Sequence, residues 1–127
     1  MYDKNIVIDL LKSIIEIVEP LNDFTSKIKS INDLNELLNS TEGVLQLRGI
    51  CMTLQVVGET VKIIDKKTNS HLLNQLPEIE WSNIIKMRDK ISHHYYGLNL
   101  EAIYDIMKNH IPPLLVVTQK IITFLEK

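Results

Sequence analysis

The chain has 127 residues, of which 45% are hydrophobic, 24% charged and 6% aromatic, and its formal net charge is -2. This length is enough to bury one continuous core but not two, so we expect a single domain over residues 1–127. The apolar content excludes a disordered chain, and the balance of 14 basic against 16 acidic residues excludes a nucleic-acid-coating tail. Any contact with nucleic acid must therefore be local.

Cysteine content and the first residues bear on the compartment. Cys51 is the only cysteine, which excludes an intrachain disulfide framework and a thiolate-rich zinc site. Asp9 and Lys12 interrupt the apolar core that a signal peptide would need, and no stretch reaches the roughly 18 apolar residues of a membrane span. We therefore expect a cytoplasmic protein that does not enter the membrane.

The N-terminal third predicts helices. Residues 3–18 carry two adjacent apolar rows at helical spacing. Pro20 is expected to interrupt the pattern, and Asn32 or Asp33 to cap a short helix that ends at Leu38. The two rows consist of Val7, Leu10, Ile14 and Ile17, and of Ile8, Leu11, Ile15 and Val18.

Residues 41–66 form the most periodic segment and predict a long helix. Its two apolar rows lie on nearly opposite sides, so we expect this helix to pack between neighbours along its whole length. Glu59 falls in the second row, where a carboxylate needs a cationic partner, and Gly58 would admit another backbone. The rows are Leu47, Ile50, Leu54, Val57, Val61 and Ile64, and Leu45, Met52, Val56 and Ile63.

The C-terminal half predicts a polar loop over residues 67–76 and three further helices. The first covers residues 81–95, with Ser82 as a possible cap and Gly97 at its end. Asn99 would cap a second helix over residues 100–109. The Pro112-Pro113 pair separates it from a last amphipathic helix bearing Leu114, Val117, Ile121 and Phe124. The fold class is therefore all-α, a compact bundle of five or six helices.

The segment from Lys86 to Tyr96 departs from ordinary bundle composition, because it holds three cations, two imidazoles, a carboxylate and two phenols. On a regular helix Arg88 and Tyr95 nearly superpose, whereas His93 lies about 140° round from Arg88. Both could serve one phosphate if the Arg88 side chain reaches across, if the helix distorts before Gly97, or if a second chain completes the cleft. The sequence leaves all three arrangements open.

Arg88-Asp89, then His93, then Tyr95 fit the pattern Arg-x4-His-x-Tyr. In this pattern the chain resembles the HepT-like branch of the HEPN proteins. Gly58-Glu59 within the long helix, and Pro77 and Trp81 ahead of the motif, fit the same family. The resemblance extends from about residue 47 to residue 115, and the N-terminal part shares only its helical character.

The resemblance implies a HEPN-like fold and a metal-independent endoribonuclease, with RNA as substrate and no cofactor. It also implies the toxin of a toxin–antitoxin pair, a homodimer whose two motifs face one cleft. The antitoxin of such a pair is a minimal nucleotidyltransferase that transfers AMP to the motif tyrosine, here Tyr95. The chain departs from the family pattern at Lys86, where a glycine is frequent, and His94 and Tyr96 add bulk beside the motif.

The residue types suit this chemistry. RNA cleavage without a metal needs a proton acceptor for the 2′-hydroxyl, a proton donor for the leaving 5′-oxygen and a fixed cation for the phosphate. His93 can move protons near neutral pH, and Arg88 offers a bidentate fork. Asp89 would orient either of them, with Glu59 and Ser92 in support.

Plainer interpretations stay open beside this one. Arg88 could be a structural partner of Glu59, His93 a solvent-facing residue and Tyr95 an edge of the core. The whole chain could be a non-catalytic helical module that binds a nucleotidyltransferase or a nucleotide. A metal site at His93 and His94 is disfavoured, because adjacent residues diverge on a helix.

We also expect Cys51 in the core, His71 and His110 at the surface, and Lys66 and Lys67 in solvent. A homodimer is expected as well, because it would hide the wide apolar faces of the first and central helices.

Overall fold

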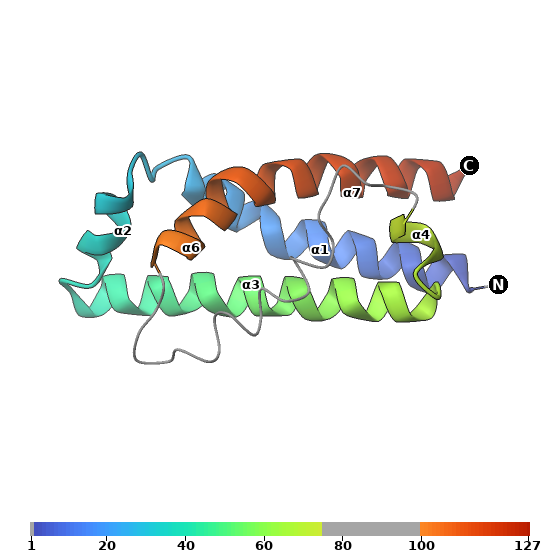
Figure 1. Ribbon diagram of the computed structural model, residues 1–127, viewed down its shortest axis with the longest axis horizontal. Coiled ribbons are helices and arrows are strands. Elements are labelled where there is room, and N and C mark those ends of the chain that lie inside the picture. Colours follow the sequence, from blue (N-terminus) through green and yellow to red (C-terminus); the bar gives the residue numbers. More distant parts are fainter. Residues whose placement is uncertain (1, 75–99) are drawn as a thin grey trace.

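The structure of the protein is a computed structural model that describes residues 2–74 and 100–127. The predicted helix over residues 81–95, with Ser82 and Gly97 at its ends, and the predicted cap Asn99 lie outside this part of the chain. Every described element is a helix, as Figure 1 shows. No helix in the described ranges is long and apolar enough to cross a bilayer.

Helix α1 spans Lys4–Thr25, and Asp3 caps it by accepting hydrogen bonds from the backbone N–H groups of Asn5 and Ile6 at 2.9 and 3.3 Å. The prediction that Pro20 interrupts this helix is wrong. Pro20 is exposed, so water can solvate the carbonyl that loses its partner there. Val18 and Leu21 are buried on either side of it, and their packing keeps the helix continuous.

Helix α2 spans Ile31–Leu37 and begins after Ser30, so neither Asn32 nor Asp33 is its cap. The Asp33 carboxylate instead accepts a hydrogen bond from the backbone N–H of Lys29 at 2.7 Å. Helix α3 spans Thr41–Lys67, which confirms the predicted long helix to within one residue. The Ser40 hydroxyl caps it by accepting from the N–H of Gly43 at 2.9 Å.

The two faces of α3 have different surroundings. The first predicted row, from Leu47 to Ile64, is buried throughout. In the second row Leu45 and Met52 are each 61% exposed and Ile63 is 42% exposed, while Val56 is half-buried. Within residues 2–74 and 100–127, helices therefore cover only one side of α3, and the prediction that it packs between neighbours holds there for the first row alone.

The predicted polar loop after α3 contains a short helix, α4, over His71–Asn74. The loop prediction is wrong there, because Leu72 and Leu73 are both only 3% exposed. Cys51 is 8% exposed, which confirms its place in the core, and burial raises the pKa of its thiol. Lys66 and Lys67 are exposed as predicted.

The C-terminal described segment is one continuous helical path. It runs through α6 (Leu100–Asp105), a π-helical turn η1 (Ile106–His110) and α7 (Ile111–Glu126). The proline pair stands in the first turn of α7, where a missing N–H costs nothing. Phe124 is 69% exposed, so its predicted place in the buried stripe is wrong, and Leu125 takes that place.

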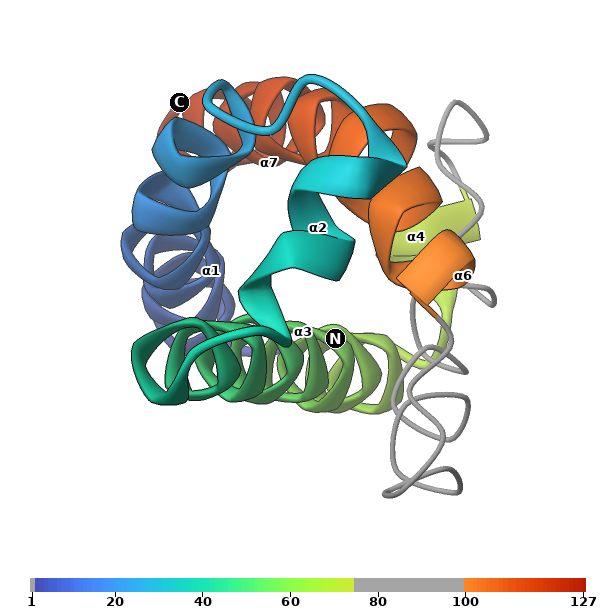
Figure 2. The same ribbon diagram turned by 90° about the vertical axis from the view of Figure 1, so that its left-hand side faces the viewer.

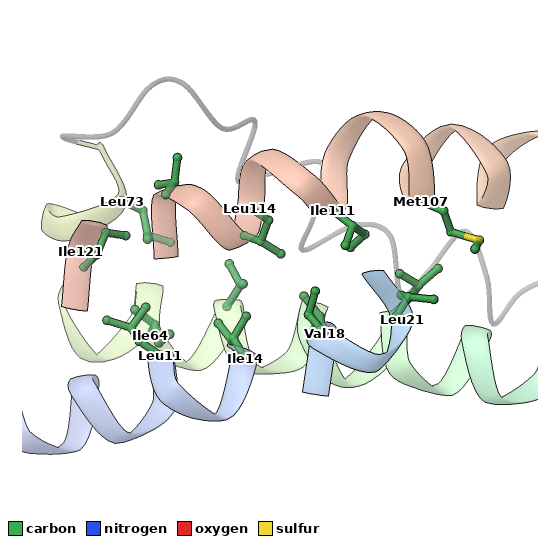
Figure 3. Close-up of a cluster of buried hydrophobic side chains, with 14 of the residues drawn as sticks. Leu11, Ile14, Val18, Leu21, Ile64, Leu73, Met107, Ile111, Leu114 and Ile121 are labelled. Carbon is green, nitrogen blue, oxygen red and sulfur yellow. The ribbon is translucent and has the colours of Figure 1, made fainter. Parts of the chain in front are cut away.

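Figure 2 shows α1, α3 and α7 on three sides of the core, with α2 and α6 near one end of the bundle. Side chains of α1 meet those of α7 and α3 in the core, to which Leu73 of α4 and Ile121 of α7 also belong (Figure 3). This arrangement confirms the predicted all-α helical bundle. The core contributors labelled in that view are Leu11, Ile14, Val18, Leu21, Ile64, Leu73, Met107, Ile111, Leu114 and Ile121.

Candidate functional site

Most of the predicted site lies outside the described residues. This holds for Arg88, Asp89, Ser92, His93 and Tyr95. Their roles stay predictions. Glu59 is the predicted site residue that it does describe.

Glu59 lies on α3 between the buried residues Gly58 and Thr60. It is half-buried and has at least one interaction partner. The Thr60 hydroxyl is satisfied within the helix, because it donates to the Val56 carbonyl at 2.8 Å. Glu59 is thus held on a rigid helical turn at the margin of the core.

The two described elements that flank the motif segment lie toward opposite ends of the bundle. Helix α4 stands at the end where α3 finishes, and α6 stands beside α2 (Figure 1). After the motif segment the chain is joined by two long-range hydrogen bonds to the end of α1 and to the loop that follows it. The Lys108 Nζ donates to the Thr25 carbonyl at 3.1 Å, and the Tyr104 hydroxyl to the Lys29 carbonyl at 3.3 Å.

The π-helical turn creates a polar cluster that the sequence does not reveal. His110 Nε2 lies 3.3 Å from Asp105 Oδ2, and the Asn109 amide donates to Asp105 Oδ1 at 2.7 Å. Residues five apart diverge on an α-helix, but a π-helix brings positions i and i+5 one turn apart. His110 is accordingly half-buried and paired rather than a plain surface residue.

Two hollows whose lining residues are all described, one on α7 and one between α2 and α3, contain neither a histidine nor a carboxylate. One lies on the outer face of α7, and the other lies where α2 meets α3, lined by Leu38, Asn39, Ser40, Thr41, Val44, Leu45 and Arg48. Neither hollow can supply the proton transfers of RNA cleavage near neutral pH. Within residues 2–74 and 100–127, no three His, Cys, Asp or Glu side chains are placed to hold a metal ion.

The family model for the HepT-like ribonucleases matches residues 14–121. The chain belongs to the HepT-like ribonuclease family. The matched range includes the segment that carries Arg88, His93 and Tyr95. The resemblance found in the sequence is therefore confirmed. The match also shows that the chain belongs to a family of enzymes, the ribonucleases.

Individual relatives agree with that family. The chain is 29% identical to MJ0127, named as a candidate RNase of Methanocaldococcus jannaschii, over 93% of this chain and 85% of the relative. It is 27% identical to a protein of Thermococcus cleftensis named as a probable ribonuclease HepT, over 84% and 86% of the two chains. No solved structure matches this HepT-like ribonuclease.

Proposed function

We propose that this HepT-like ribonuclease is an endoribonuclease that cuts RNA without a metal ion, using Arg88 and His93. The observation that carries the proposal is the family match over residues 14–121, which contains the Arg-x4-His-x-Tyr segment. Asp89 would orient the reacting pair, and Ser92 and Glu59 would support it. The half-buried position of Glu59 on α3 suits an anion that holds a neighbouring cation in place.

The reaction follows from the two side chains. A neutral His93 accepts the 2′-hydroxyl proton, the 2′-oxygen attacks the phosphorus, and the bond to the 5′-oxygen breaks. The 5′-oxygen takes a proton from the imidazolium, either of the same chain or of a second one. Arg88 stabilises the charge on the two phosphate oxygens through paired N–H donors. The products carry a 2′,3′-cyclic phosphate and a 5′-hydroxyl.

The exposed row on α3 supports a homodimer. Leu45, Met52 and Ile63 lie opposite the core face, so the described helices leave them exposed. Apolar rows of this kind mark interfaces, and a twofold dimer would cover the row with the same row of a second chain. Glu59 stands in that row, so the interface would border the residue proposed to support Arg88. Both motifs could then face one cleft.

Control of the enzyme would come from modification of Tyr95. We propose that a minimal nucleotidyltransferase antitoxin transfers AMP from ATP to the Tyr95 hydroxyl with release of pyrophosphate, and that the chain is the toxin of this pair in the cytoplasm. An anionic nucleotide beside Arg88 occupies the place of the substrate phosphate, which blocks cleavage without refolding. Intact-mass measurement after incubation with the antitoxin and ATP tests this. The Tyr95→Phe chain is expected to stay unmodified, and modification at another residue would refute the assignment.

The nature of the product ends tests the cleavage chemistry. The purified chain is incubated with RNA in excess chelator, and the new ends are analysed by mass spectrometry. Cyclic phosphate and 5′-hydroxyl ends are expected. Cleavage that stops in chelator, or products with 5′-phosphates, would refute the metal-independent route. An absence of cleavage would favour the non-catalytic helical module instead.

A further inference from the structure

We infer that the outer face of α7 is an RNA-binding surface outside the cleavage chemistry, on which Phe124 stacks against a base while Lys120 and Lys127 contact phosphates. The inference rests on the proposed function in one respect, namely that the substrate is RNA. Through this face the ribonuclease would bind a stretch of the RNA away from the bond that is cleaved. The surface consists of Val116, Gln119, Lys120, Thr123, Phe124 and Lys127, and is called the α7 surface below.

The shape of the α7 surface is the first argument. Its six residues line one hollow, on the side of α7 opposite the buried residues Leu114 and Ile121. Phe124 is 69% exposed, the largest exposed fraction among the large hydrophobic residues of the described chain. An aromatic ring contributes to folding by being buried, and this ring stays in water. Its free face is available to a planar ligand.

The charge of the α7 surface is the second argument. Lys120 precedes Phe124 by four residues and shares its helical face, and Lys127, which follows the last residue of α7, lines the same hollow. Neither lysine has an ion-pair partner within the described part of the chain, and no acidic side chain lines the hollow. The adjacent Glu126 is engaged elsewhere, because its Oε2 lies 3.3 Å from Lys12 Nζ on α1. A chain of net charge -2 therefore presents a locally basic strip here.

This combination favours single-stranded RNA over a protein partner. Proteins that hold single strands combine cationic side chains with aromatic rings, because every base has a face that stacks. Protein interfaces are depleted in lysine at their centre, and Lys120 and Lys127 are two of the six residues of the α7 surface. The exposed row on α3 has the opposite character, since Leu45, Met52 and Ile63 are apolar and the charged residue among them, Glu59, is an anion.

Fluorescence anisotropy with a labelled 2′-O-methyl oligouridylate of about 20 nucleotides tests the inference. This probe lacks the 2′-hydroxyl nucleophile, so its binding does not depend on the proposed cleavage chemistry. Phe124→Leu keeps the apolar volume but removes the stacking face, and it is expected to weaken binding by roughly ten-fold. Phe124→Trp keeps a stacking face and is expected to retain the affinity of the unsubstituted chain.

The salt dependence of the same binding separates phosphate contacts from general charge. The double variant Lys120→Gln, Lys127→Gln is expected to reduce the slope of log Kd against log salt by about 1.4, since each contact to a single strand contributes about 0.7. The matched control Lys66→Gln, Lys67→Gln makes the same charge change on exposed lysines of α3 and is expected to leave the slope unchanged.

Three results would overturn the inference: no binding of the probe, equal binding by the Phe124→Leu chain, or equal slopes for the two double variants. If Phe124→Leu alters self-association in light scattering and leaves probe binding intact, the α7 surface is a protein contact instead. Cleavage of natural RNA by the unsubstituted chain is measured separately. The proposed function can therefore fail while the α7 surface stands, and the reverse also holds.

Discussion

Gly43, in the first turn of α3, lies directly against the backbone of Leu37 at the end of α2. A Cβ added to Gly43 would stand 2.8 Å from both the Cα and the carbonyl carbon of Leu37, and it would also meet the Leu37 carbonyl oxygen. Backbone atoms cannot move aside as the end of a side chain can. The absence of a side chain at Gly43 therefore sets how closely α2 folds onto α3.

Gly43→Ala is accordingly expected to lower the free energy of unfolding by roughly 1–3 kcal/mol, the usual cost of overpacking. Gly49→Ala is the matched control on the same helix, because its added methyl meets no described residue of the same chain within 4 Å. That variant is expected to gain up to about 1 kcal/mol from the better helix propensity of alanine. Urea denaturation measures both, and equal effects of the two substitutions would contradict the packing seen here.

The Lys108 amino group fastens the π-helical turn to the C-terminus of α1. Lys108→Met removes its hydrogen bond to the Thr25 carbonyl and keeps most of the side-chain volume, so a loss of about 1 kcal/mol is expected. Lys62→Met serves as the control, because Lys62 is exposed and has no partner among the described residues. Thermal unfolding at constant pH compares them. A Lys108 variant as stable as the Lys62 variant would show that this bond contributes nothing.

Thr118 differs from the other buried threonines. Its hydroxyl is completely buried and has no hydrogen-bond partner in the described chain, whereas the Thr25 hydroxyl donates to the Leu21 carbonyl at 2.8 Å. Thr118→Val is expected to stabilise the protein by up to about 1 kcal/mol, because it removes an unsatisfied buried group. Thr25→Val is expected to destabilise it by about the same amount. Urea denaturation that gave the opposite order would refute this difference between the two sites.

The exposed row on α3 predicts a dimer that should dissociate when a single charged residue is introduced into the row. Met52→Glu places a carboxylate opposite its own copy in a twofold interface, so light scattering at micromolar concentration is expected to report a monomer. Val116→Glu makes a comparable change at an exposed apolar residue of α7 and is expected to leave the dimer intact. A dimer that survives Met52→Glu, or an unsubstituted chain that is monomeric, would rule out this interface.

Periodicity predicted the long helices well, because one buried stripe decides their position. The α3 boundaries followed from the row Leu47 to Ile64, which fills the core. Local signals were less reliable where tertiary packing opposed them. Pro20 does not end α1, and the polar stretch after α3 still turns Leu72 and Leu73 into the core. The exposed position of Phe124 likewise depended on which of two neighbouring stripes α7 buries.

Some features of the molecule can be recognised from a sequence motif, and others only from the three-dimensional structure. Arg88, His93 and Tyr95 were predicted because their types and spacing fit the motif of one family, and the family model matches the range 14–121 in which they lie. The Asp105–His110 pair had no such signal, since its contact requires a π-helical turn that no residue pattern announces. The α7 surface was missed because Phe124 was assigned to the core.

RNA cleavage by the His93→Ala chain, beside a His94→Ala chain, tests the central claim most directly. The two substitutions remove the same side chain from adjacent positions, so composition and charge change equally. In excess chelator, His93→Ala is expected to slow cleavage by about 10²–10⁴-fold, the usual contribution of a positioned proton-transfer group, while His94→Ala is expected to cut within a few-fold of the unsubstituted chain. Undiminished cleavage by the His93→Ala chain would contradict the account.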